Sequence, residues 1–310
     1  MIYFQSLTRP ELVELLRPLD ERKAKFRAEQ IFKWVYQRHV TDWSLMTDLA
    51  KSLRTWLAEN VEIYRLPEQV CKQASDGTRK FLWTLGDGRT IESVIIPSAL
   101  DAEAGVGEEE SPGSRPESIS PRVLEPVKSD YSGRGHWGFE DLQSERWGRL
   151  TACISSQVGC AMACRFCLTG VQGLDRNLAT HEIVAQIHEL RMRAPITNIV
   201  FMGMGEPLHN LDHVIQACRI FLDASGFGFS KRKVTVSTSG LVPGIERLGR
   251  ELDVSLAISL NASTDAQRSD LMPVNKRWDL QELLAACRRY PLGPHRRITF
   301  EYVLFRDFND

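Results

Sequence analysis

Cysteines are the residues of this chain whose spacing points most directly to chemistry. Four of the seven cysteines lie within fifteen positions: Cys153, and then Cys160, Cys164 and Cys167 in "GCAMACRFC". Three thiolates on one short loop can bind three irons of a [4Fe-4S] cluster and leave the fourth iron open to another ligand. A zinc site completed by Cys153, His181 or His188 is an alternative, and buried unreactive thiols are a third interpretation.

The cysteine loop follows the run "RLTACISS", which predicts a buried strand. From residue 149 onward, further apolar runs alternate with segments of helical periodicity. The runs are "TNIVFMG", "KVTVSTSG", "VSLAISLNA" and "RITFEYVLF", and helices are expected near 180–193 (with Thr180 as N-cap), 211–224, 243–250 and 279–290. This alternation predicts parallel βα units, in a barrel or a doubly wound sheet. Active sites in such folds lie at the carboxyl ends of the strands, where the cysteine loop begins.

The first part of the chain has a different pattern. Three helical segments are expected within 9–60, and "KFLWTL", a turn and "RTIESVIIP" predict a β-hairpin. A segment rich in Glu, Ser, Pro and Gly follows and predicts a flexible insertion, because it cannot bury enough apolar surface to offset its ordering entropy. We therefore expect a helical domain over 1–62, a hairpin connection over 63–98, the insertion over 99–146 and an α/β core over 147–310.

The composition describes an ordinary globular chain. Of its 310 residues 43% are hydrophobic and 25% charged, and the formal net charge is -1, so any nucleic acid must be met by local basic patches. The start of the chain lacks the pattern of a secretion signal, and no apolar run approaches the ~20 residues of a membrane span. We therefore expect a cytoplasmic protein without a membrane partner. In that reducing compartment, clustered cysteines favour metal binding or catalysis over structural disulfides.

The cysteine loop resembles the signature loop of radical S-adenosylmethionine (SAM) enzymes, including the aromatic Phe166 before the last cysteine. The stretches around it narrow the resemblance to the RlmN/Cfr family of RNA adenosine methyltransferases. They are "CISSQVGCAMACRFCLTGVQGLDRNL", "TNIVFMGMGEPLHNLDHV", "GFGFSKRKVTVSTSG" and "LAISLNASTDAQRSDLMPVNK". The resemblance implies a partial (βα)6 radical-SAM barrel whose C-terminal part is missing from this chain, behind the small helical domain and the hairpin.

The resemblance also implies a set of cofactor-binding residues. Cys160, Cys164 and Cys167 match the ligands of a [4Fe-4S] cluster, whose open iron holds SAM and cleaves it to a 5′-deoxyadenosyl radical. In "MGMGEP", Gly203 and Gly205 let the backbone approach a ligand closely. The positions that match SAM contacts are Gly205, Glu206, Ser237, Ser259, Leu260 and Asn261.

The implied reaction is methylation of carbon 2 of adenosine in 23S rRNA and in tRNA. That carbon has no nucleophilic lone pair, so the family uses a radical route in which a methylated cysteine near the C-terminus attacks the base. Cys153 matches the cysteine that resolves the protein–RNA adduct through a transient disulfide bond, and Glu92 matches the acidic residue that removes a proton. The cluster requires an electron donor such as flavodoxin.

Two alternatives remain open at this stage. The first is methylation at carbon 8 of adenosine, as in the antibiotic-resistance branch of the family. The second is an iron–sulfur RNA-binding protein without catalysis, because the methyl-carrying cysteine of the family lies downstream of residue 310 and the chain stops on a predicted strand, as a fragment would.

Several other features have simpler interpretations. Cys218 and Cys287 lie on apolar helix faces, which predicts buried unreactive thiols, and Cys71 matches no functional position of the family. The basic stretches "ERKAKFRAEQ" and "SKRKV", Arg288–Arg289 and "HRR" at 295–297 are solvated surface or, with the family resemblance, candidate contacts to RNA phosphates.

Overall fold

The computed structural model describes residues 1–98, 149–293 and 296–310. The insertion expected over 99–146 lies outside these residues. Within them, no helix combines the length and the apolar character that crossing a membrane requires.

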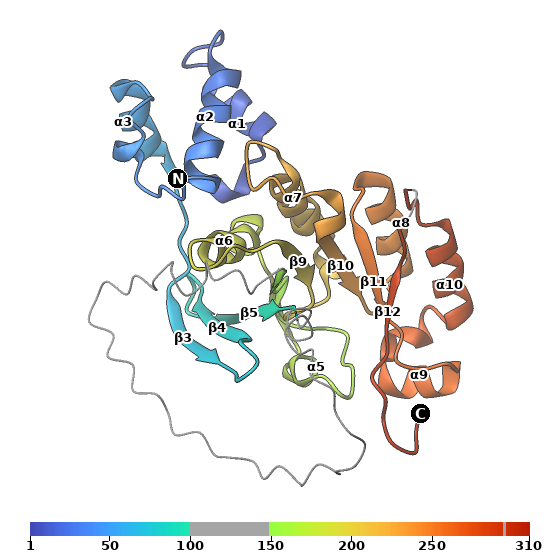
Figure 1. Cartoon of the computed structure of the whole chain (residues 1–310). Helices are drawn as coiled ribbons and strands as arrows, with labels where there is room; N and C mark the ends of the chain where they lie inside the picture. Colours follow the sequence, from blue (N-terminus) through green and yellow to red (C-terminus); the bar gives the residue numbers. More distant parts are fainter. Residues whose placement is uncertain (99–148, 294–295) are drawn as a thin grey trace, which may run out of the picture. The chain divides into compact units, whose positions relative to one another are not determined.

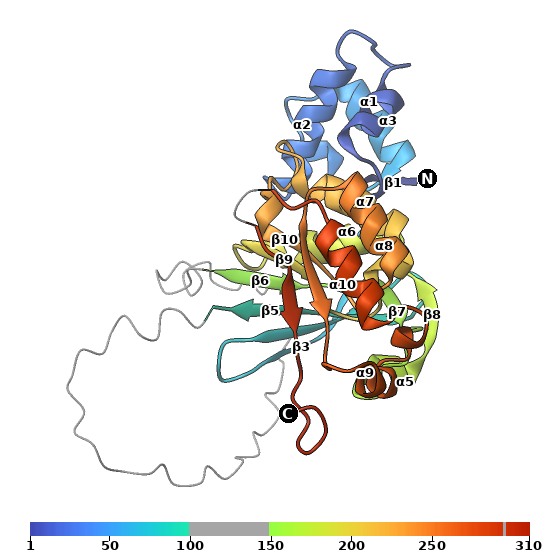
Figure 2. The ribbon, with the colours of Figure 1, turned by 90° about the vertical axis from the view of Figure 1, so that its right-hand side faces the viewer.

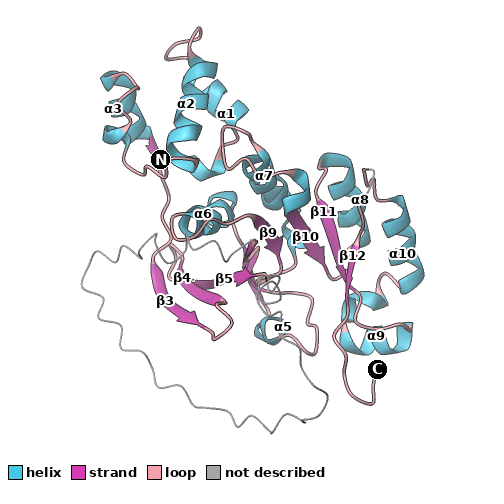
Figure 3. Ribbon diagram, viewed as in Figure 1, coloured by secondary structure: helices cyan, strands magenta, loops and turns pink. Residues whose placement is uncertain are grey.

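An eight-stranded sheet forms the centre of the fold (Figures 1 and 3). Its strand order is β12-β11-β10-β9-β6-β5-β4-β3, and the five strands from β12 to β6 run parallel. The parallel strands are β6 (Leu150–Cys153), β9 (Asn198–Phe201), β10 (Val234–Thr238), β11 (Ser255–Ser259) and β12 (Thr299–Glu301). All five lie within the predicted runs, so the expected α/β core is confirmed as an open sheet of parallel strands.

The predicted hairpin is present and continues this sheet. Strands β3 (Glu68–Gln73), β4 (Arg79–Thr84) and β5 (Thr90–Pro97) form an antiparallel meander. Strand β5 then pairs antiparallel with β6, with Val94 opposite Cys153. Residues 63–98 therefore extend the core sheet, because β3, β4 and β5 belong to the same hydrogen-bonded sheet as the five parallel strands.

Helices cover one face of the sheet, in the order of the chain (Figure 2). They are α6 (Thr180–Arg191), α7 (Leu211–Leu222), α8 (Val242–Glu251) and α10 (Leu280–Arg289), close to the predicted ranges. The N-cap of α6 is Ala179 rather than Thr180, whose hydroxyl hydrogen-bonds with Nδ1 of His213 at 3.0 Å. Two short helices were not predicted: α5 (Leu168–Gln172) and α9 (Asp265–Leu271).

The N-terminal helices are α1 (Arg9–Leu16), α2 (Ala24–Tyr36) and α3 (Lys51–Asn60), as the sequence predicts. Strand β1 (Ile2–Tyr3) pairs in parallel with β2 (Val61–Glu62) and closes the segment. Its core is aromatic, since the ring of Phe4 packs against the rings of Phe32, Tyr36 and Trp43. An ion pair of 2.9 Å between Arg9 and Asp223 joins α1 to the end of α7.

Candidate active site

The face of the sheet opposite the helices carries polar, partly accessible side chains. Strand residues alternate between the two faces, so the register assigns each side chain to a face. On the helix-covered face Ile95, Ala152, Ile199 and Val236 are almost completely buried. The other face, the open face below, carries Glu92, Cys153, Thr235, Ser237, Ser259 and Glu301. Val94, Val200 and Ala257 lie on the same face, so it combines apolar positions with hydroxyls, a thiol and carboxylates.

The cysteine loop lies at the carboxyl end of this sheet. Cys160 follows strand β7 (Gln157–Gly159), and Cys167 is the N-cap of α5. The pKa of Cys164 is raised to about 12, mainly by burial. The thiolates of Cys160 and Cys167 and the carboxylate of Glu206 add to the increase. The same kind of repulsion from Glu206 and Cys167 adds to burial in raising the pKa of Cys160. The amide of Cys167 also donates to the carbonyl of Cys164 at 3.0 Å, so the cysteines share one tight loop. Their thiolates would repel one another, and a cation placed among them would relieve that repulsion.

These thiols fit a cluster better than a single ion. Among the residues that the structure describes, no group of three His, Cys, Asp or Glu side chains is gathered as ligands of one metal ion. In a cubane cluster each cysteine binds a different iron, so the three sulfurs need not converge on one point. The donor set, three soft thiolates on one loop, is the one that iron–sulfur clusters use.

A short antiparallel sheet holds the base of the cysteine loop. Strand β7 pairs with β8 (Leu174–Asn177), and the amide of Cys160 donates to the carbonyl of Gly173. Gly159 has φ +76°, and a Cβ there would lie 1.8 Å from the carbonyl oxygen of Gly173. No side chain fits in that gap, so glycine at 159 is required for the close approach of the two strands.

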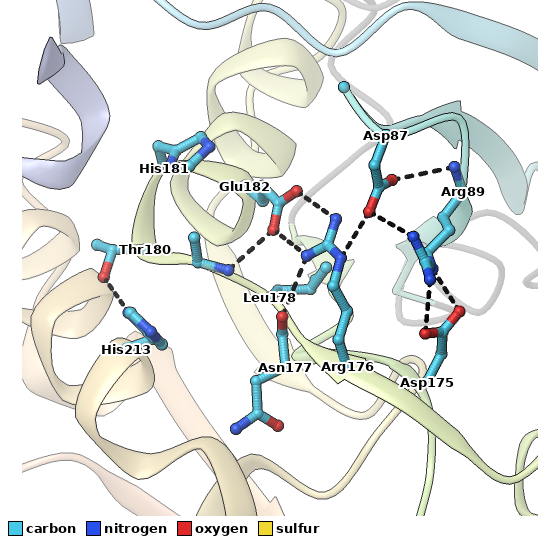
Figure 4. Close-up of polar contacts among 12 residues, drawn as sticks. Asp87, Arg89, Asp175, Arg176, Asn177, Leu178, Thr180, His181, Glu182 and His213 are labelled. Carbon is cyan, nitrogen blue, oxygen red and sulfur yellow. Dashed lines mark hydrogen bonds and ion pairs between the residues drawn. The ribbon is translucent and has the colours of Figure 1, made fainter. Parts of the chain in front are cut away.

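A network of ion pairs fastens this small sheet to the hairpin and to α6 (Figure 4). Arg176 on β8 pairs with Asp87 at 2.7 Å and with Glu182 of α6 at 2.8 Å. Arg89 pairs with Asp87 at 3.0 Å and also with Asp175. The hydrogen bond from Arg176 is the main cause that lowers the pKa of Asp87 to about 2.

Glu206 lies buried beside the cysteine loop, after β9. Its carboxylate accepts hydrogen bonds from the amides of Ser239, at 2.7 Å, and Leu208, at 3.0 Å. Burial raises the pKa of Glu206, while these amide donors oppose the increase. The close approaches of Gly203 and Gly205 are to the chain's own residues: a Cβ at Gly203 would meet Ile154 and Ser155, and one at Gly205 would meet Gln157. Both glycines thus seat the loop of Glu206 against the segment that leads to Cys160.

The carboxyl ends of β10, β11 and β12 meet through Glu301. Its carboxylate accepts hydrogen bonds from the hydroxyls of Ser237 and Ser259, each at 3.2 Å, and its backbone carbonyl accepts the amide of Leu260 at 2.9 Å. Asn261 follows in the left-handed region, with φ +57°. Its side-chain oxygen accepts the amide of Val303 at 3.0 Å. The expected SAM-contacting positions on β10 and β11 therefore share one carboxylate, that of Glu301.

Cys153 and Glu92 occupy neighbouring strands on the open face. Burial raises the pKa of the Cys153 thiol to about 11, and the carboxylate of Glu301 contributes to the increase. Glu92 lies two residues from Val94, the partner of Cys153, and its side chain forms an ion pair of 2.7 Å with Lys80. The carbonyl of Glu92 accepts the hydroxyl of Ser155 at 2.6 Å, which places Glu92 level with the start of the cysteine segment.

All seven cysteines are free thiols in the structure. Cys218 and Cys287 are buried, as predicted. Cys71 is half-buried on β3, away from the cysteine loop in the sheet order.

Sequence reasoning did not single out two residues of this region, Glu301 and Arg268. Arg268 is completely buried and donates hydrogen bonds to the carbonyls of Ser239, at 2.6 Å, and Leu260, at 3.0 Å. Each is a charged residue within an otherwise mostly apolar or motif-bearing stretch of the sequence. Glu301 lies in "RITFEYVLF", and Arg268 lies in "LAISLNASTDAQRSDLMPVNK". For Glu301, a charge within a run that predicts a buried strand indicates a specific partner. Arg268 lies in α9, which was not predicted, so its burial left no such signal.

This arrangement, a parallel sheet with three loop cysteines and a buried carboxylate at its carboxyl edge, matches a known class of enzymes. Residues 154–310 match the Radical SAM superfamily, and residues 4–63 match the ribosomal RNA large subunit methyltransferase N-terminal domain. A solved radical SAM methyltransferase from Sphaerobacter thermophilus superposes with a TM-score of 0.77 at 38% sequence identity, over 100% of this chain and 78% of that one.

Comparison with curated relatives identifies the family within the Radical SAM superfamily. The dual-specificity RNA methyltransferase RlmN of Geobacter sulfurreducens is 46% identical over 100% of this chain and 72% of its own length. The RlmN of Pelobacter propionicus is 45% identical over 99% of this chain and 74% of its own length. The chain belongs to the RlmN family of radical SAM RNA methyltransferases. The family resemblance stated from the sequence is thereby confirmed.

Proposed function

We propose that the chain binds a [4Fe-4S] cluster through Cys160, Cys164 and Cys167 and binds SAM at the adjacent strand ends, and that it methylates carbon 2 of adenosine in 23S rRNA and tRNA. The observation that carries this proposal is the hydrogen bond of 2.8 Å from the amide of Glu206 to the side-chain oxygen of Gln157, three residues before Cys160. It brings the cluster loop and the expected SAM-binding loop to one place. The bound cluster and SAM together supply a methyl group and a radical strong enough to act on an unactivated carbon.

The residues of the chain bind and orient these groups. The cysteine thiolates hold iron, and the backbone at Gly205 with the carboxylate of Glu206 faces the cationic amino group of SAM. Ser237, Ser259, Leu260 and Asn261 line the other strand ends. The two serine hydroxyls hydrogen-bond to Glu301, which fixes their orientation toward the open face.

Cys153 and Glu92 act on the RNA adduct in this proposal. Glu92 removes a proton from the methylated base carbon, and its side chain is held by an ion pair of 2.7 Å with Lys80. Cys153 attacks the sulfur of the methyl-carrying cysteine, which the family places downstream of residue 310. The S–S bond forms as the bond between that sulfur and the methylene carbon breaks, and this carbon takes up the proton of Cys153. Burial raises the pKa of the Cys153 thiol, so the resting thiol is a poor nucleophile. It reacts only when its proton is transferred to the adduct.

The helical segment over 1–62 is the accessory RNA-binding part, and a one-electron carrier such as flavodoxin reduces the cluster in the cytoplasm. Some of the basic residues considered for phosphate contact are paired inside the chain. Lys231 and Arg296 both pair with Asp253, and Arg289 pairs with Glu246. RNA contact at these positions therefore competes with existing ion pairs.

The decisive experiment is anaerobic reconstitution with iron and sulfide, followed by SAM, a reductant and measurement of 5′-deoxyadenosine. We expect a brown protein that forms 5′-deoxyadenosine, a Cys164→Ser variant that forms none, and a Cys218→Ser variant that matches the unaltered protein. A colourless protein with stoichiometric zinc contradicts the proposal, and a cluster without SAM cleavage supports an iron–sulfur RNA-binding protein instead.

The position of methylation is tested in cells. Deleting the gene removes 2-methyladenosine from 23S rRNA and tRNA if the proposal is correct, as measured by mass spectrometry of the nucleosides. Loss of 8-methyladenosine instead identifies the carbon-8 activity.

A further inference from the structure

Arg268 of α9 is a buried cation with an unusual set of partners. Its guanidinium donates to the carbonyls of Ser239, Ser259 and Leu260 and, at 2.9 Å, to the side-chain oxygen of Asn275. The side chain is 0% exposed. No ion pair of Arg268 with a carboxylate occurs in the described residues 1–98, 149–293 and 296–310.

Burying such a charge is costly. Burial lowers the pKa of Arg268, although carbonyl dipoles satisfy its donors. A buried cation is ordinarily kept in folded proteins by a nearby anion. The nearby carboxylate of Asp265 already accepts hydrogen bonds from Asn275 and from the amide of Leu280, both at 2.9 Å. The Cys164 thiolate opposes this decrease in the pKa of Arg268 more than Asp265 does. The C-terminal residue of α9, Leu271, contacts the cysteine loop, because its carbonyl accepts the amide of Arg165 at 2.9 Å.

Arg268 also connects the two halves of the candidate site. On one side it holds the ends of β10 and β11, where Ser239 donates its amide to Glu206. On the other side α9 holds the cysteine loop, since the carbonyl of Leu271 accepts the amide of Arg165 at 2.9 Å and Asp270 pairs with the Arg165 side chain. Movement of α9 would therefore shift the cysteines relative to the strand ends.

We propose that Arg268 is a positioning residue for the iron–sulfur cluster: its guanidinium fixes α9 to the strand ends, and its charge stabilises the anionic, thiolate-bound cluster on the neighbouring loop. The proposal rests on the proposed function, because it requires the cluster. A cluster with three thiolates carries net negative charge, which grows on reduction, so a buried cation on the helix that contacts the cysteine loop favours the reduced form.

The test is an anaerobic redox titration, followed by electron paramagnetic resonance, of the reconstituted full chain and its variants. Arg268→Gln and Arg268→Met remove the charge, and Arg268→Lys retains it. Arg277→Gln is the matched control, since it removes an exposed arginine six residues after α9, stacked at 4.7 Å on Trp278. Iron content and melting temperature are measured for every variant.

We expect both neutral variants to shift the reduction equilibrium at least tenfold toward the oxidised cluster, which is about 59 mV for one electron. Arg268→Lys and Arg277→Gln are expected to stay close to the unaltered protein. Neutral variants that fold but bind no iron, while Arg268→Lys binds it, also support the proposal.

Three results overturn the inference. They are equal potentials in all variants, an equal shift in Arg268→Lys and Arg268→Gln, and unfolding of both neutral variants even after reconstitution, which assigns Arg268 a purely structural role. Absence of an iron–sulfur cluster from the unaltered protein contradicts the proposed function itself, so the two failures are distinguishable.

Discussion

The two faces of the sheet differ in what they contribute to this molecule. The helix-covered face carries Phe81, Ile95, Ile199 and Phe201, which are at most 3% exposed and pack beneath α6 to α8. The open face carries the hydroxyls, thiol and carboxylates of Thr235, Ser237, Ser259, Cys153, Glu92 and Glu301, at alternate positions of the strands of the same sheet. A single strand therefore serves stability with one set of side chains and chemistry with the other. Neighbouring substitutions should consequently have different kinds of effect.

The largest stability effect is expected on the covered face, at Phe201. Phe201→Ala should lower the free energy of unfolding by about 3–5 kcal/mol, because it leaves a cavity in a packed core beside Phe221. Val200→Ala, on the adjacent, partly exposed position, should cost about 1 kcal/mol. Urea unfolding of both variants measures the difference, and equal losses would contradict the assignment of faces.

The next largest effect is expected on acidification, which should lower the free energy of unfolding through the buried His188 of α6. Burial lowers the pKa of His188 to about 4, so the folded chain keeps the ring neutral while the unfolded chain binds a proton below its ordinary pKa of 6.5. Stability is therefore lost as the pH falls from 6.5 toward 4, by about 2 kcal/mol between pH 7 and 5. His188→Gln should flatten this part of the stability profile in urea titrations. An unchanged slope would exclude His188 as its cause.

On the open side, Glu206→Gln should weaken cofactor binding with less effect on stability. The substitution removes a charge that accepts two amide hydrogen bonds, and hydrogen bonds to charged groups contribute about 1.5–3 kcal/mol. SAM affinity of the reconstituted protein should fall at least about tenfold in equilibrium dialysis. Glu282→Gln, at an exposed position of α10, is the control. Unchanged affinity for SAM in Glu206→Gln would remove Glu206 from the cofactor site.

The smallest effect is expected where neither face is involved, at the ion pairs of the hairpin turn. Asp87→Asn should cost at most about 1 kcal/mol at neutral pH, because Asp87 is solvent-accessible and its pairs are screened. Since the pKa of Asp87 is lowered to about 2, the contribution is present above pH 3.8 and is lost as the pH falls toward 2. Unfolding at low and high salt should show the difference shrinking with salt. A larger loss of unfolding free energy that does not depend on salt would show that Asp87 stabilises the fold through packing and not through its ion pairs.

Local patterns predicted the regular elements of this fold. The apolar runs gave the five parallel strands, and 3.6-residue periodicity gave α6, α7, α8 and α10. Helices α5 and α9 have five and seven residues, too few for a periodic signal. The pairing of β5 with β6 was not predicted either, because 52 residues separate the end of β5 at Pro97 from the start of β6 at Leu150, and strand pairing over such a distance leaves no local mark.

The candidate site was predictable where residue type and spacing sufficed. The cysteine loop and the loop of Glu206 are short motifs, and the structure brings them together at the sheet edge. Glu301 and Arg268 depend on register and on helix placement. Only the alignment of β10, β11 and β12 shows that Ser237 and Ser259 share one carboxylate, and only the position of α9 shows which carbonyls Arg268 reaches.

The antiparallel pairing of β5 with β6 has a consequence for whether the sheet can close. Each strand has two hydrogen-bonding edges, and those of β6 are both occupied, by β5 and by β9. No strand that follows β12 can pair with β6 and complete a closed cylinder. Within the described residues the sheet therefore ends at two edge strands, β12 and β3, and its open face is not enclosed by a cylinder of strands.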